Sequence, residues 1–438
     1  MQILKLECIF VDKFIINGGN KLYGEIAISG AKNAAVAIIP AVVLCDEPCV
    51  IENLPRIRDV SVILAILEHM GAKIERKSDS VVMIDPRGIT SSNVTCENLV
   101  SDMRASYYLL GVLLGRFHNA LVPYPGGCSF CERPIDLHLK AFETLGAHYD
   151  ILFDKIKLES ENLRGATINF EIVSVGATMN AMLAAVKTPG VTIIEGAAKE
   201  PHIVDLANFL MSMGANIRGA GTDVIKIRGV DRLHGCTYSI IPDQIEAGTY
   251  MAAVAATGGN VLIKNVTPEH LDSIISKLRD TGTTVEINDE SVRVIREGQL
   301  KACQLKTMPH PGFPTDMQPQ FVALLSTAAG KSRVMECVWE DRFSYIPQLR
   351  KMKADIIDNG NVAYIHGRER LRGAKVRALD LRAGAAMVIA GLAAEGVTEI
   401  EDIKYIERGY EKIIEKLASV GADIRRVTVK ESTDENNL

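Results

Sequence analysis

A short pattern of apolar and polar positions recurs six times along the chain. Each time, an apolar stretch with helical spacing ends at a glycine or its equivalent, and a segment of alternating residues typical of a strand follows. The glycine position falls at Gly71, Gly146, Gly214, Gly282, Lys353 and Gly421, so the intervals are 75, 68, 68, 71 and 68 residues. Glycine is the usual residue just past the end of a helix, because it adopts positive φ without strain. Six matches at this spacing indicate an internal repeat.

Each repeat contains the same order of predicted elements. A helix rich in small residues comes first, as in 176–186, 247–257 and 383–394. A β-branched strand follows, as in 191–194, 260–263 and 397–400. An amphipathic helix then ends at the glycine, and more strand comes after it. This βαβαββ-like order predicts an α/β fold of six units of ~70 residues, three in each of two domains.

The position of the first repeat predicts how the two domains divide the chain. Because this repeat starts near Gly30, the leading strands in 14–29 are expected to complete the last repeat. We therefore predict one domain at 33–241 and a second domain formed by 1–32 together with 242–438. The chain would cross between them near 29–33 and near 240–243.

Composition narrows the class of protein. The chain has 438 residues, of which 47% are hydrophobic and 24% charged, as in ordinary globular proteins with substantial cores. A formal net charge of −5 argues against nucleic acid as a partner. The longest uncharged apolar run, 34–45, has 12 residues and is too short to span a bilayer, and no secretory signal is recognisable. Nine cysteines fit no small disulfide framework, so a reduced, cytoplasmic protein with no membrane partner is expected.

Polar residues occupy two equivalent positions in successive repeats. At the start of the first helix stand Lys32 and Asn33, Arg104, Ser174, Asp243, Asp316, and Asp380 with Arg382; between the strand and the second helix stand Arg133, Glu200, Glu269, Arg342 and Arg408. Carboxylates at helix starts are usually caps. Cations there oppose the helix dipole, so Lys32, Arg104 and Arg382 indicate a bound anion.

A glycine-rich segment, Pro125-Gly126-Gly127-Cys128, adds a candidate reactive thiol. The glycines free the backbone just before Cys128, and Arg133 and Pro134 follow where a helix is predicted to begin. A thiol between a flexible turn and a cationic helix start ionises more easily than a buried one. The pattern is typical of a reactive cysteine.

Seven motifs together resemble the enolpyruvyl transferases, in family order from about residue 11 to about 424. They are Ser29-Gly30-Ala31-Lys32-Asn33-Ala34-Ala35, Met103-Arg104-Ala105-Ser106, the Cys128 loop with Arg133-Pro134-Ile135-Asp136-Leu137-His138, Ser174-Val175-Gly176-Ala177-Thr178, Pro314-Thr315-Asp316-Met317-Gln318, Asp380-Leu381-Arg382-Ala383 and Arg408-Gly409-Tyr410-Glu411. The resemblance implies a two-domain inside-out α/β barrel that closes on its substrates. The nearest branch adds the 3′-hydroxyl of UDP-N-acetylglucosamine to C2 of phosphoenolpyruvate and eliminates phosphate, the first committed step of peptidoglycan synthesis. No metal and no organic cofactor is implied.

The resemblance also implies roles for individual residues. Lys32, Arg133 and Arg408 would hold the phosphate and carboxylate of phosphoenolpyruvate, with Arg104 and Arg382 near the anion. Asp316 would deprotonate or orient the sugar hydroxyl, Asn33 and Val338 would contact the sugar, and Ser174, Val175 and Gly176 would bind the diphosphate. Ile135, Asp136 and Leu137 would bracket the uracil, with Pro134 beside them among the substrate-binding residues. Cys128 would donate the proton to C3, and would be the residue that fosfomycin attacks.

Three residues depart from the family pattern and leave alternatives open. Cys131 stands where glycine is usual and creates Cys128-x-x-Cys131, for which we weigh a reversible disulfide, a thioredoxin-like redox pair and half of a zinc site. Gln244 stands where arginine is usual, and His202 where an acidic residue is common. Competing functions are transfer to another acceptor, either a different uridine nucleotide or shikimate 3-phosphate, and a non-catalytic paralogue that binds UDP-sugar.

Overall fold

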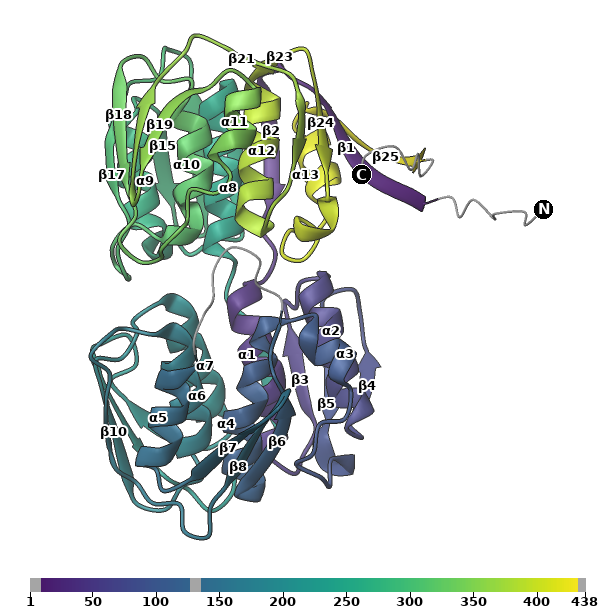
Figure 1. Ribbon diagram of the computed structural model, residues 1–438, viewed down its shortest axis with the longest axis vertical. Helices are drawn as coiled ribbons and strands as arrows, with labels where there is room; N and C mark the ends of the chain where they lie inside the picture. The colour runs from purple at the N-terminus through teal and green to yellow at the C-terminus, as the bar shows by residue number, and fades with distance from the viewer. Residues whose placement is uncertain (1–8, 127–134, 432–438) are drawn as a thin grey trace, which may run out of the picture. The chain divides into compact units, whose positions relative to one another are not determined.

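The computed structural model describes residues 9–126 and 135–431, which form two compact units (Figure 1). The N-terminal unit consists of the described parts of Ser29–Asp243 together with Pro309–Gly312; the C-terminal unit consists of the described parts of Met1–Ile28, Gln244–Met308 and Phe313–Leu438. The domain limits predicted from the repeats, 33–241 against 1–32 with 242–438, stay a prediction. The return of 309–312 to the N-terminal unit was not foreseen from the sequence.

Three sheets belong to the N-terminal unit. Two have four strands, in the orders β13-β3-β5-β4 and β9-β10-β12-β11, and one has three, in the order β6-β8-β7. Their strands are β3 (Cys49–Glu52), β4 (Lys73–Arg76), β5 (Val82–Asp85), β6 (Asn119–Pro123), β7 (His148–Leu152), β8 (Lys155–Glu159), β9 (Thr167–Asn169), β10 (Val191–Glu195), β11 (Asn216–Arg218), β12 (Val224–Arg228) and β13 (Thr237–Ser239).

Three four-stranded sheets belong to the C-terminal unit, in the orders β2-β14-β16-β15, β17-β18-β20-β19 and β22-β24-β1-β25, with a small pair β21-β23. Their strands are β1 (Ile9–Asn17), β2 (Leu22–Ala27), β14 (Gly259–Lys264), β15 (Thr284–Asn288), β16 (Ser291–Arg296), β17 (Gln304–Lys306), β18 (Lys331–Met335), β19 (Asp355–Asn359), β20 (Val362–His366), β21 (Leu371–Arg372), β22 (Lys375–Arg377), β23 (Ala394–Glu395), β24 (Val397–Glu401) and β25 (Asp423–Glu431).

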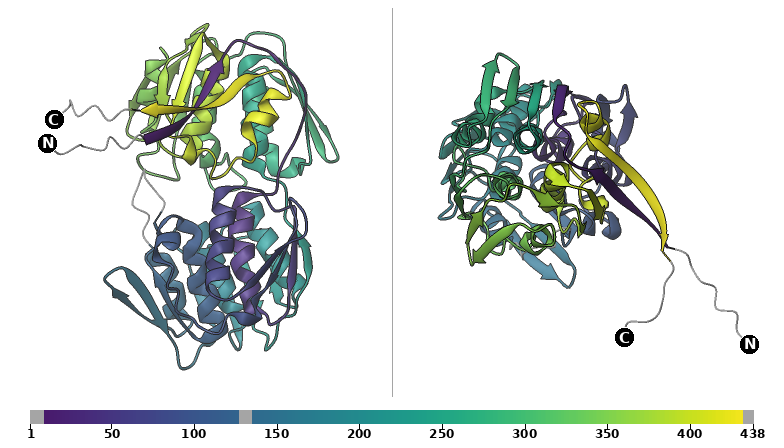
Figure 2. Two further views of the ribbon diagram at one scale, coloured as in Figure 1. Left: turned by 90° about the vertical axis from the view of Figure 1, so that its right-hand side faces the viewer. Right: turned by 90° about the horizontal axis from the view of Figure 1, so that it is seen from above.

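The five larger sheets share one pairing scheme. A parallel pair comes first, and two antiparallel pairs follow, as in β9-β10-β12-β11. In the last repeat, β1 takes the third place, where it pairs antiparallel with both β24 and β25, and the two views of Figure 2 show β1 and β25 side by side. The second leading strand, β2, instead pairs parallel with β14 in the fourth repeat. The expectation that both leading strands complete the last repeat was therefore correct for β1 and wrong for β2.

Each repeat also supplies an inner and an outer helix. The inner helices are α1 (Lys32–Ala41), α4 (Tyr108–Phe117), α6 (Val175–Ala185), α8 (Gln244–Thr257), α10 (Gln318–Leu325) and α12 (Leu381–Ala393); the outer ones are α2 (Arg58–His69), α5 (Asp136–Thr144), α7 (Pro201–Ser212), α9 (Asp272–Asp280), α11 (Ile346–Lys351) and α13 (Ile413–Ala418). Almost every residue of an inner helix is buried, whereas an outer helix buries one stripe. Small residues let the inner helices approach closely: a Cβ on Gly111 of α4 would lie 2.6 Å from the backbone oxygen of Asn180 in α6. The result is a mixed α/β fold.

The shorter helical segments are α3 (Glu97–Ser101) and the 3₁₀ turns η1 (Val42–Leu44), η2 (Pro86–Gly88), η3 (Arg104–Tyr107), η4 (Pro268–Leu271), η5 (Thr315–Met317) and η6 (Ile403–Tyr405). Two of them, η3 and η5, lead directly into the inner helices α4 and α10. Throughout the described ranges, no helix is both long enough and apolar enough to cross a membrane.

The residue at the glycine position, two or three residues past each outer helix, has positive φ in all six repeats. The φ angles are 111° at Gly71, 96° at Gly146, 102° at Gly214, 83° at Gly282, 67° at Lys353 and 100° at Gly421. The predicted helix ends are thus confirmed, including the fifth repeat, where a lysine takes the left-handed conformation that glycine adopts in the others.

Candidate functional site

The polar residues predicted to start the inner helices do so in both units. Lys32 opens α1, Arg104 opens η3, Ser174 caps α6, Asp243 precedes α8, Asp316 lies in η5 and Asp380 caps α12. Each unit therefore has its own cluster of polar side chains at these helix starts, which we call the N-terminal and the C-terminal cluster.

The C-terminal cluster is built around the Asp316 carboxylate. Arg382 donates to Asp316 Oδ2 from Nε at 3.1 Å and from Nη2 at 2.9 Å, and Arg342 Nη2 reaches Asp316 Oδ1 at 3.4 Å. Both arginines are almost fully buried, whereas 32% of the Asp316 side chain is exposed. Asp380 orders this arrangement, because its carboxylate caps α12 by accepting from the backbone N–H groups of Arg382 and Ala383. Two buried cations thus contact the partly exposed Asp316 carboxylate.

Tyr410 connects the starts of all three inner helices of this unit. Its buried hydroxyl contacts Thr249 Oγ1 of α8 at 2.9 Å, and it accepts from Gln320 Nε2 of α10 and from Arg382 Nη1 of α12, both at 3.3 Å. Beside it, Lys416 Nζ of α13 pairs with Glu246 Oε1 of α8 at 2.6 Å, and both side chains are largely buried. The network fixes the segment that contains Arg408, two residues before Tyr410, against the helix starts.

Glu336 positions two of the predicted substrate residues. This buried carboxylate accepts from the hydroxyls of Thr307 at 2.7 Å and Thr315 at 3.0 Å, and from the backbone N–H groups of Val338 at 2.9 Å and Trp339 at 3.2 Å. Thr315 immediately precedes Asp316 in η5. Glu336 therefore ties Val338 to the segment that presents Asp316.

In the N-terminal cluster, Lys32 is held at both ends. Its Nζ lies 2.9 Å from Asp59 Oδ2 of α2, and its backbone N–H donates to Asp243 Oδ2 at 3.0 Å. The ion pair is largely buried, with side-chain exposures of 14% for Lys32 and 5% for Asp59. Asn33 is the next residue of α1 and is half-buried. The ammonium group is thus fixed at the start of α1.

A neutral cluster joins the starts of α4, α5 and α6. Asn180 Nδ2 donates to the backbone oxygen of Tyr107 at 3.0 Å and lies 2.8 Å from His138 Nδ1, whose ring packs edge-on against Tyr107. Burial, with a smaller contribution from the Arg104 charge, lowers the pKa of His138 to about 3, so the ring is neutral. Because Asn180 Nδ2 is already a donor, Nδ1 accepts and Nε2 carries the proton. Gly176 leaves room for this ring: a Cβ there would lie 2.8 Å from the Tyr107 hydroxyl and 2.9 Å from His138 Cε1.

The remaining predicted residues of this unit lie near that cluster. Ser174 caps α6 by accepting from Ala177 N at 3.3 Å, and Val175 and Gly176 form the first turn. Arg104 stacks over the Tyr107 ring at 5.7 Å. Ile135 is buried at the start of α5, followed by the exposed Asp136 and the half-buried Leu137. Cys128, Arg133 and Pro134, together with Cys131, lie outside the described residues.

Asp205 is a buried acid whose partners among the described residues are neutral donors. It accepts from the Tyr238 hydroxyl at 2.6 Å and from Ile241 N at 3.4 Å. Burial outweighs these hydrogen bonds and raises the pKa of Asp205 to about 6. Ile241 stands two residues before the end of the long N-terminal segment at Asp243, so Asp205 anchors the point where the chain leaves this unit.

Several site residues were missed from the sequence. Four of them are marked only by the burial of a polar side chain, which cannot be seen in the sequence: Glu336, Glu246, Lys416 and Asn180. Tyr410 and His138 stood inside recognised motifs without a role, and Arg342 only held an equivalent position in the repeat. Gln244 begins α8, beside the second predicted crossing between the domains, and His202 lies in α7.

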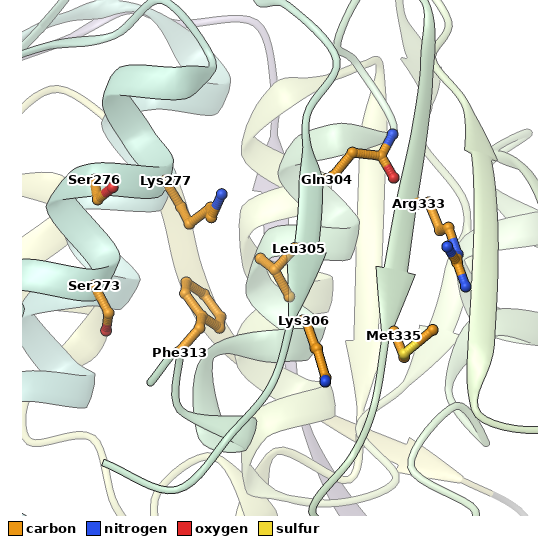
Figure 3. Close-up of a pocket in the computed structure, with 9 residues that line it drawn as sticks. All are labelled: Ser273, Ser276, Lys277, Gln304, Leu305, Lys306, Phe313, Arg333 and Met335. Carbon is orange, nitrogen blue, oxygen red and sulfur yellow. The ribbon is translucent and has the colours of Figure 1, made fainter. Parts of the chain in front are cut away.

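A surface pocket of about 380 Å³ lies in the C-terminal unit, between α9 and the strands β17 and β18 (Figure 3). Its base is apolar, with Leu305, Phe313 and Met335, and its rim bears Lys277 and Arg333 among other polar side chains. None of the predicted site residues lines it. Within the described ranges, no group of three or more His, Cys, Asp or Glu side chains is arranged to hold a metal ion.

Comparisons with known proteins show the family of the chain. Residues 16–417 match the family described as EPSP synthase (3-phosphoshikimate 1-carboxyvinyltransferase). The chain is 56% identical over 417 residues to UDP-N-acetylglucosamine 1-carboxyvinyltransferase 3 of Caldanaerobacter subterraneus subsp. tengcongensis and 53% identical over 418 residues to UDP-N-acetylglucosamine 1-carboxyvinyltransferase of Clostridium botulinum; each match covers 95% of this chain and 100% of the relative.

Solved structures show the same fold. The enolpyruvyl transferase NikO from Streptomyces tendae superposes with a TM-score of 0.86 at 26% identity, covering 96% of this chain and 99% of that one. EPSP synthase from Acinetobacter baumannii gives 0.74 at 18% identity, covering 95% of this chain and 100% of that one, and this likeness concerns the fold alone. The chain belongs to the EPSP synthase family of enolpyruvyl transferases.

Proposed function

We propose that the protein transfers the enolpyruvyl group of phosphoenolpyruvate to the 3′-hydroxyl of UDP-N-acetylglucosamine and releases phosphate. The observation that carries this proposal is the identity of 53–56% over 95% of the chain with relatives named for that reaction. The reaction is an addition followed by an elimination. A proton goes to C3 of phosphoenolpyruvate while the sugar oxygen bonds to C2, and the tetrahedral product then loses a C3 proton and phosphate.

The geometry of Asp316 supports a role at the sugar hydroxyl. Its carboxylate is held by Arg342 and Arg382, and 32% of its side chain is exposed to solvent. An ion-paired carboxylate accepts a hydrogen bond well but is a weak base. If one guanidinium turned to the incoming phosphate or carboxylate, the basicity of Asp316 would increase when the substrate is bound. Asp316 would then orient the hydroxyl first and take its proton afterwards.

The cations at the helix starts suit a substrate with about three negative charges near neutral pH. We assign Lys32, Arg133 and Arg408 to the phosphate and carboxylate, with Arg104 and Arg382 nearby. For Lys32, the buried pair with Asp59 supports this role, because it fixes the ammonium group before substrate arrives. Cys128 is assigned as the acid that protonates C3. As Cys128 and Arg133 lie outside the described residues, their roles rest on the resemblance.

The neutral cluster around His138 suits the nucleotide part of the acceptor. A diphosphate at the start of α6 would meet backbone N–H groups and the positive end of the helix dipole. Ser174, Val175 and Gly176 form this start, and the neutral His138 beside Gly176 presents an N–H donor there without carrying a charge. Ile135, Asp136 and Leu137, with Pro134 before them, are assigned to the uracil, and Asn33 and Val338 to the sugar.

This proposal includes the finer points of the resemblance. The six repeats would form two inside-out α/β barrels, with inner helices at the centre and sheets outside. The protein would act in the cytoplasm, in peptidoglycan synthesis and so in maintenance of cell shape and in cell division. No metal or organic cofactor enters the reaction as written.

The test is to mix the purified protein with phosphoenolpyruvate and UDP-N-acetylglucosamine, and to measure released phosphate and the mass of the nucleotide sugar. We expect equal amounts of phosphate and of a nucleotide sugar heavier by one enolpyruvyl group. Asp316→Asn should lower kcat by about 10²-fold or more, since it removes a proton acceptor. The matched control is Asp402→Asn, whose partner Arg377 is exposed, and it should leave kcat unchanged.

Other outcomes would overturn the proposal in distinct ways. Phosphate release only with shikimate 3-phosphate or with another uridine nucleotide would identify a different acceptor. Binding of UDP-N-acetylglucosamine without release of phosphate under any of these conditions would identify a non-catalytic protein.

A further inference from the structure

Three cysteines outside both clusters form a chain of thiols in the N-terminal unit. Cys45 follows η1, Cys49 begins β3, and Cys236 immediately precedes β13. The sulfur atoms of Cys45 and Cys49 are 3.9 Å apart, and the Cys49 thiol in turn interacts with that of Cys236. Cys45 and Cys49 are buried and Cys236 is half-buried, so an agent in solvent meets the chain of thiols at Cys236.

The backbone holds Cys49 and Cys236 beside each other. The strands β3 and β13 are parallel, with Val50 opposite Thr237, so Cys49 and Cys236 are the preceding pair in the same register. Val50 N donates to the backbone oxygen of Cys236 at 2.9 Å. Neighbouring strands lie about 4.7–4.9 Å apart, and disulfides span Cα separations of about 4.4–6.8 Å. A disulfide between these residues therefore needs little backbone movement.

Further contacts dock the segment before β13. Glu47 accepts from Gly235 N and from Arg232 Nη2, both at 3.1 Å. A Cβ on Gly235 would lie 2.2 Å from the backbone oxygen of Pro48, so the two segments approach as closely as backbones can. These contacts keep Cys236 at Cys49 whether or not a bond joins them.

The three thiols differ in reactivity. The hydrogen bond from Cys49 lowers the pKa of Cys236, while the contact with Cys49 and burial raise the pKa of Cys45. The thiolate is the species that attacks peroxides, and it needs access to solvent. Cys236 satisfies both conditions, and Cys49 lies behind it as a second thiol.

We propose that Cys49 and Cys236 are a reversible oxidation site that takes a hydroperoxide such as hydrogen peroxide. The Cys236 thiolate attacks one peroxide oxygen, forms a sulfenic acid and releases hydroxide. The Cys49 sulfur then attacks the Cys236 sulfur, loses its proton and displaces water. In total, two thiols and one hydrogen peroxide give one disulfide and two waters, and a dithiol reductant reverses the change.

The test maps disulfides in the full-length reduced protein after treatment with hydrogen peroxide, alkylation of remaining thiols, trypsin digestion without reductant and mass spectrometry. Cys45 and Cys49 lie in the peptide 33–56 and Cys236 in the peptide 233–264. We expect these peptides to be linked, with the link through Cys49 and lost on treatment with dithiothreitol. Cys128 and Cys131 share the peptide 117–140, because trypsin does not cleave between Arg133 and Pro134, so their own predicted disulfide appears separately.

Two variants and a rate comparison sharpen the test. Cys49→Ser should leave a Cys236 sulfenic acid that dimedone traps, and Cys96→Ser, the matched control at a half-buried cysteine whose pKa is raised by burial, should leave the link unchanged. In the wild type, Cys236 should be alkylated at neutral pH about tenfold faster than Cys96. A link between Cys45 and Cys49 alone, or Cys236 remaining reduced while the exposed Cys337 is oxidised, would overturn the proposal. None of these results depends on the proposed enzymatic activity.

Discussion

The two polar clusters are built on the same repeated framework but neutralise buried polar groups in different ways. In the C-terminal cluster, the acids Asp316 and Glu246 each face a cation, supplied by Arg342 and Arg382 for the first and by Lys416 for the second. In the N-terminal unit, the buried His138 ring contacts the neutral amide of Asn180 and the buried Asp205 accepts from a hydroxyl and a backbone N–H, whereas Lys32 forms a buried ion pair with Asp59.

The repeat therefore fixes the position of a side chain but not its charge. Equivalent helix starts have a lysine in α1, an arginine before α4 and an aspartate before α10. In the proposed function, the C-terminal cluster suits a carboxylate such as Asp316, whose arginine partners are already in place and could turn to an anionic substrate. The N-terminal neutral cluster suits a group that is bound and held, because a neutral donor needs no counter-ion.

The largest expected effect comes from removing a cation of the C-terminal cluster. Arg382→Met keeps the apolar stem but removes both of its hydrogen bonds to Asp316 and takes one donor from Tyr410. We expect the free energy of unfolding in urea to fall by about 2–4 kcal/mol, since a buried charged partner is lost. In the proposed reaction, kcat/KM should fall by about 10²-fold or more.

The matched control is Arg377→Met, which breaks an exposed pair with Asp402. It should change the free energy of unfolding by less than about 1 kcal/mol. Equal losses in the two variants would contradict the idea that the cations of the C-terminal cluster stabilise it.

The second effect uses pH to test the buried acid of the N-terminal unit. Because the pKa of Asp205 is raised from 3.8 to about 6, the folded protein keeps a proton that the unfolded chain loses between these values. The stability contributed by this group is present below about pH 4, decreases as pH rises to about 6, and is constant above. Between about pH 4 and 6, the free energy of unfolding should fall by about 3 kcal/mol on account of Asp205. Asp205→Asn should remove this pH dependence, as measured by urea unfolding over the same range.

A carboxylate of the C-terminal unit, Asp12, should change the free energy of unfolding with pH in the opposite direction. Hydrogen bonds from Arg426 and Thr428 lower the pKa of Asp12, so its contribution is lost as pH falls below its ordinary value. Asp12→Asn should therefore remove a small stabilisation that increases with pH. If both variants changed the slope in the same direction, the contrast between the two acids would be wrong.

The sequence predicted the parts of this contrast that depend on spacing. The helix ends at Gly71 and its equivalents, and the helix starts at Lys32, Asp316 and Asp380, follow from the repeat and were confirmed. The partners could not be predicted, because they come from elements far apart in the chain. Asp59 meets Lys32 from α2, and Arg382 meets Asp316 across 66 residues.

A change of size rather than charge tests the neutral cluster. In Gly176→Ala, the new methyl group would press on the Tyr107 hydroxyl and the His138 ring, and the ring would have to move. We expect a loss of about 1–3 kcal/mol in the free energy of unfolding and at least about tenfold weaker binding of UDP-N-acetylglucosamine by calorimetry. Gly298→Ala is the control, because a Cβ there meets nothing within 4 Å and should change neither quantity. If Gly176→Ala bound UDP-N-acetylglucosamine as well as the wild type does, the neutral cluster would not contribute to nucleotide binding.

The smallest expected effect concerns the helix end at which one repeat differs from the other five. Lys353 has a φ of 67°, and a side chain with a Cβ strains this conformation by about 1–2 kcal/mol. Lys353→Gly should relieve that strain, although the more flexible unfolded chain offsets part of the gain, so a net stabilisation of about 0.5–1 kcal/mol is expected. The reciprocal change, Gly282→Lys, should cost a similar amount, since a Cβ at Gly282 has no neighbour closer than 3.8 Å and only the backbone opposes it. Urea unfolding of both variants measures the two values.

If Lys353→Gly is more stable and Gly282→Lys less stable than the wild type, the backbone conformation at these helix ends is the same even where the residues differ. A less stable Lys353→Gly would mean that the lysine side chain makes a contribution that glycine cannot replace.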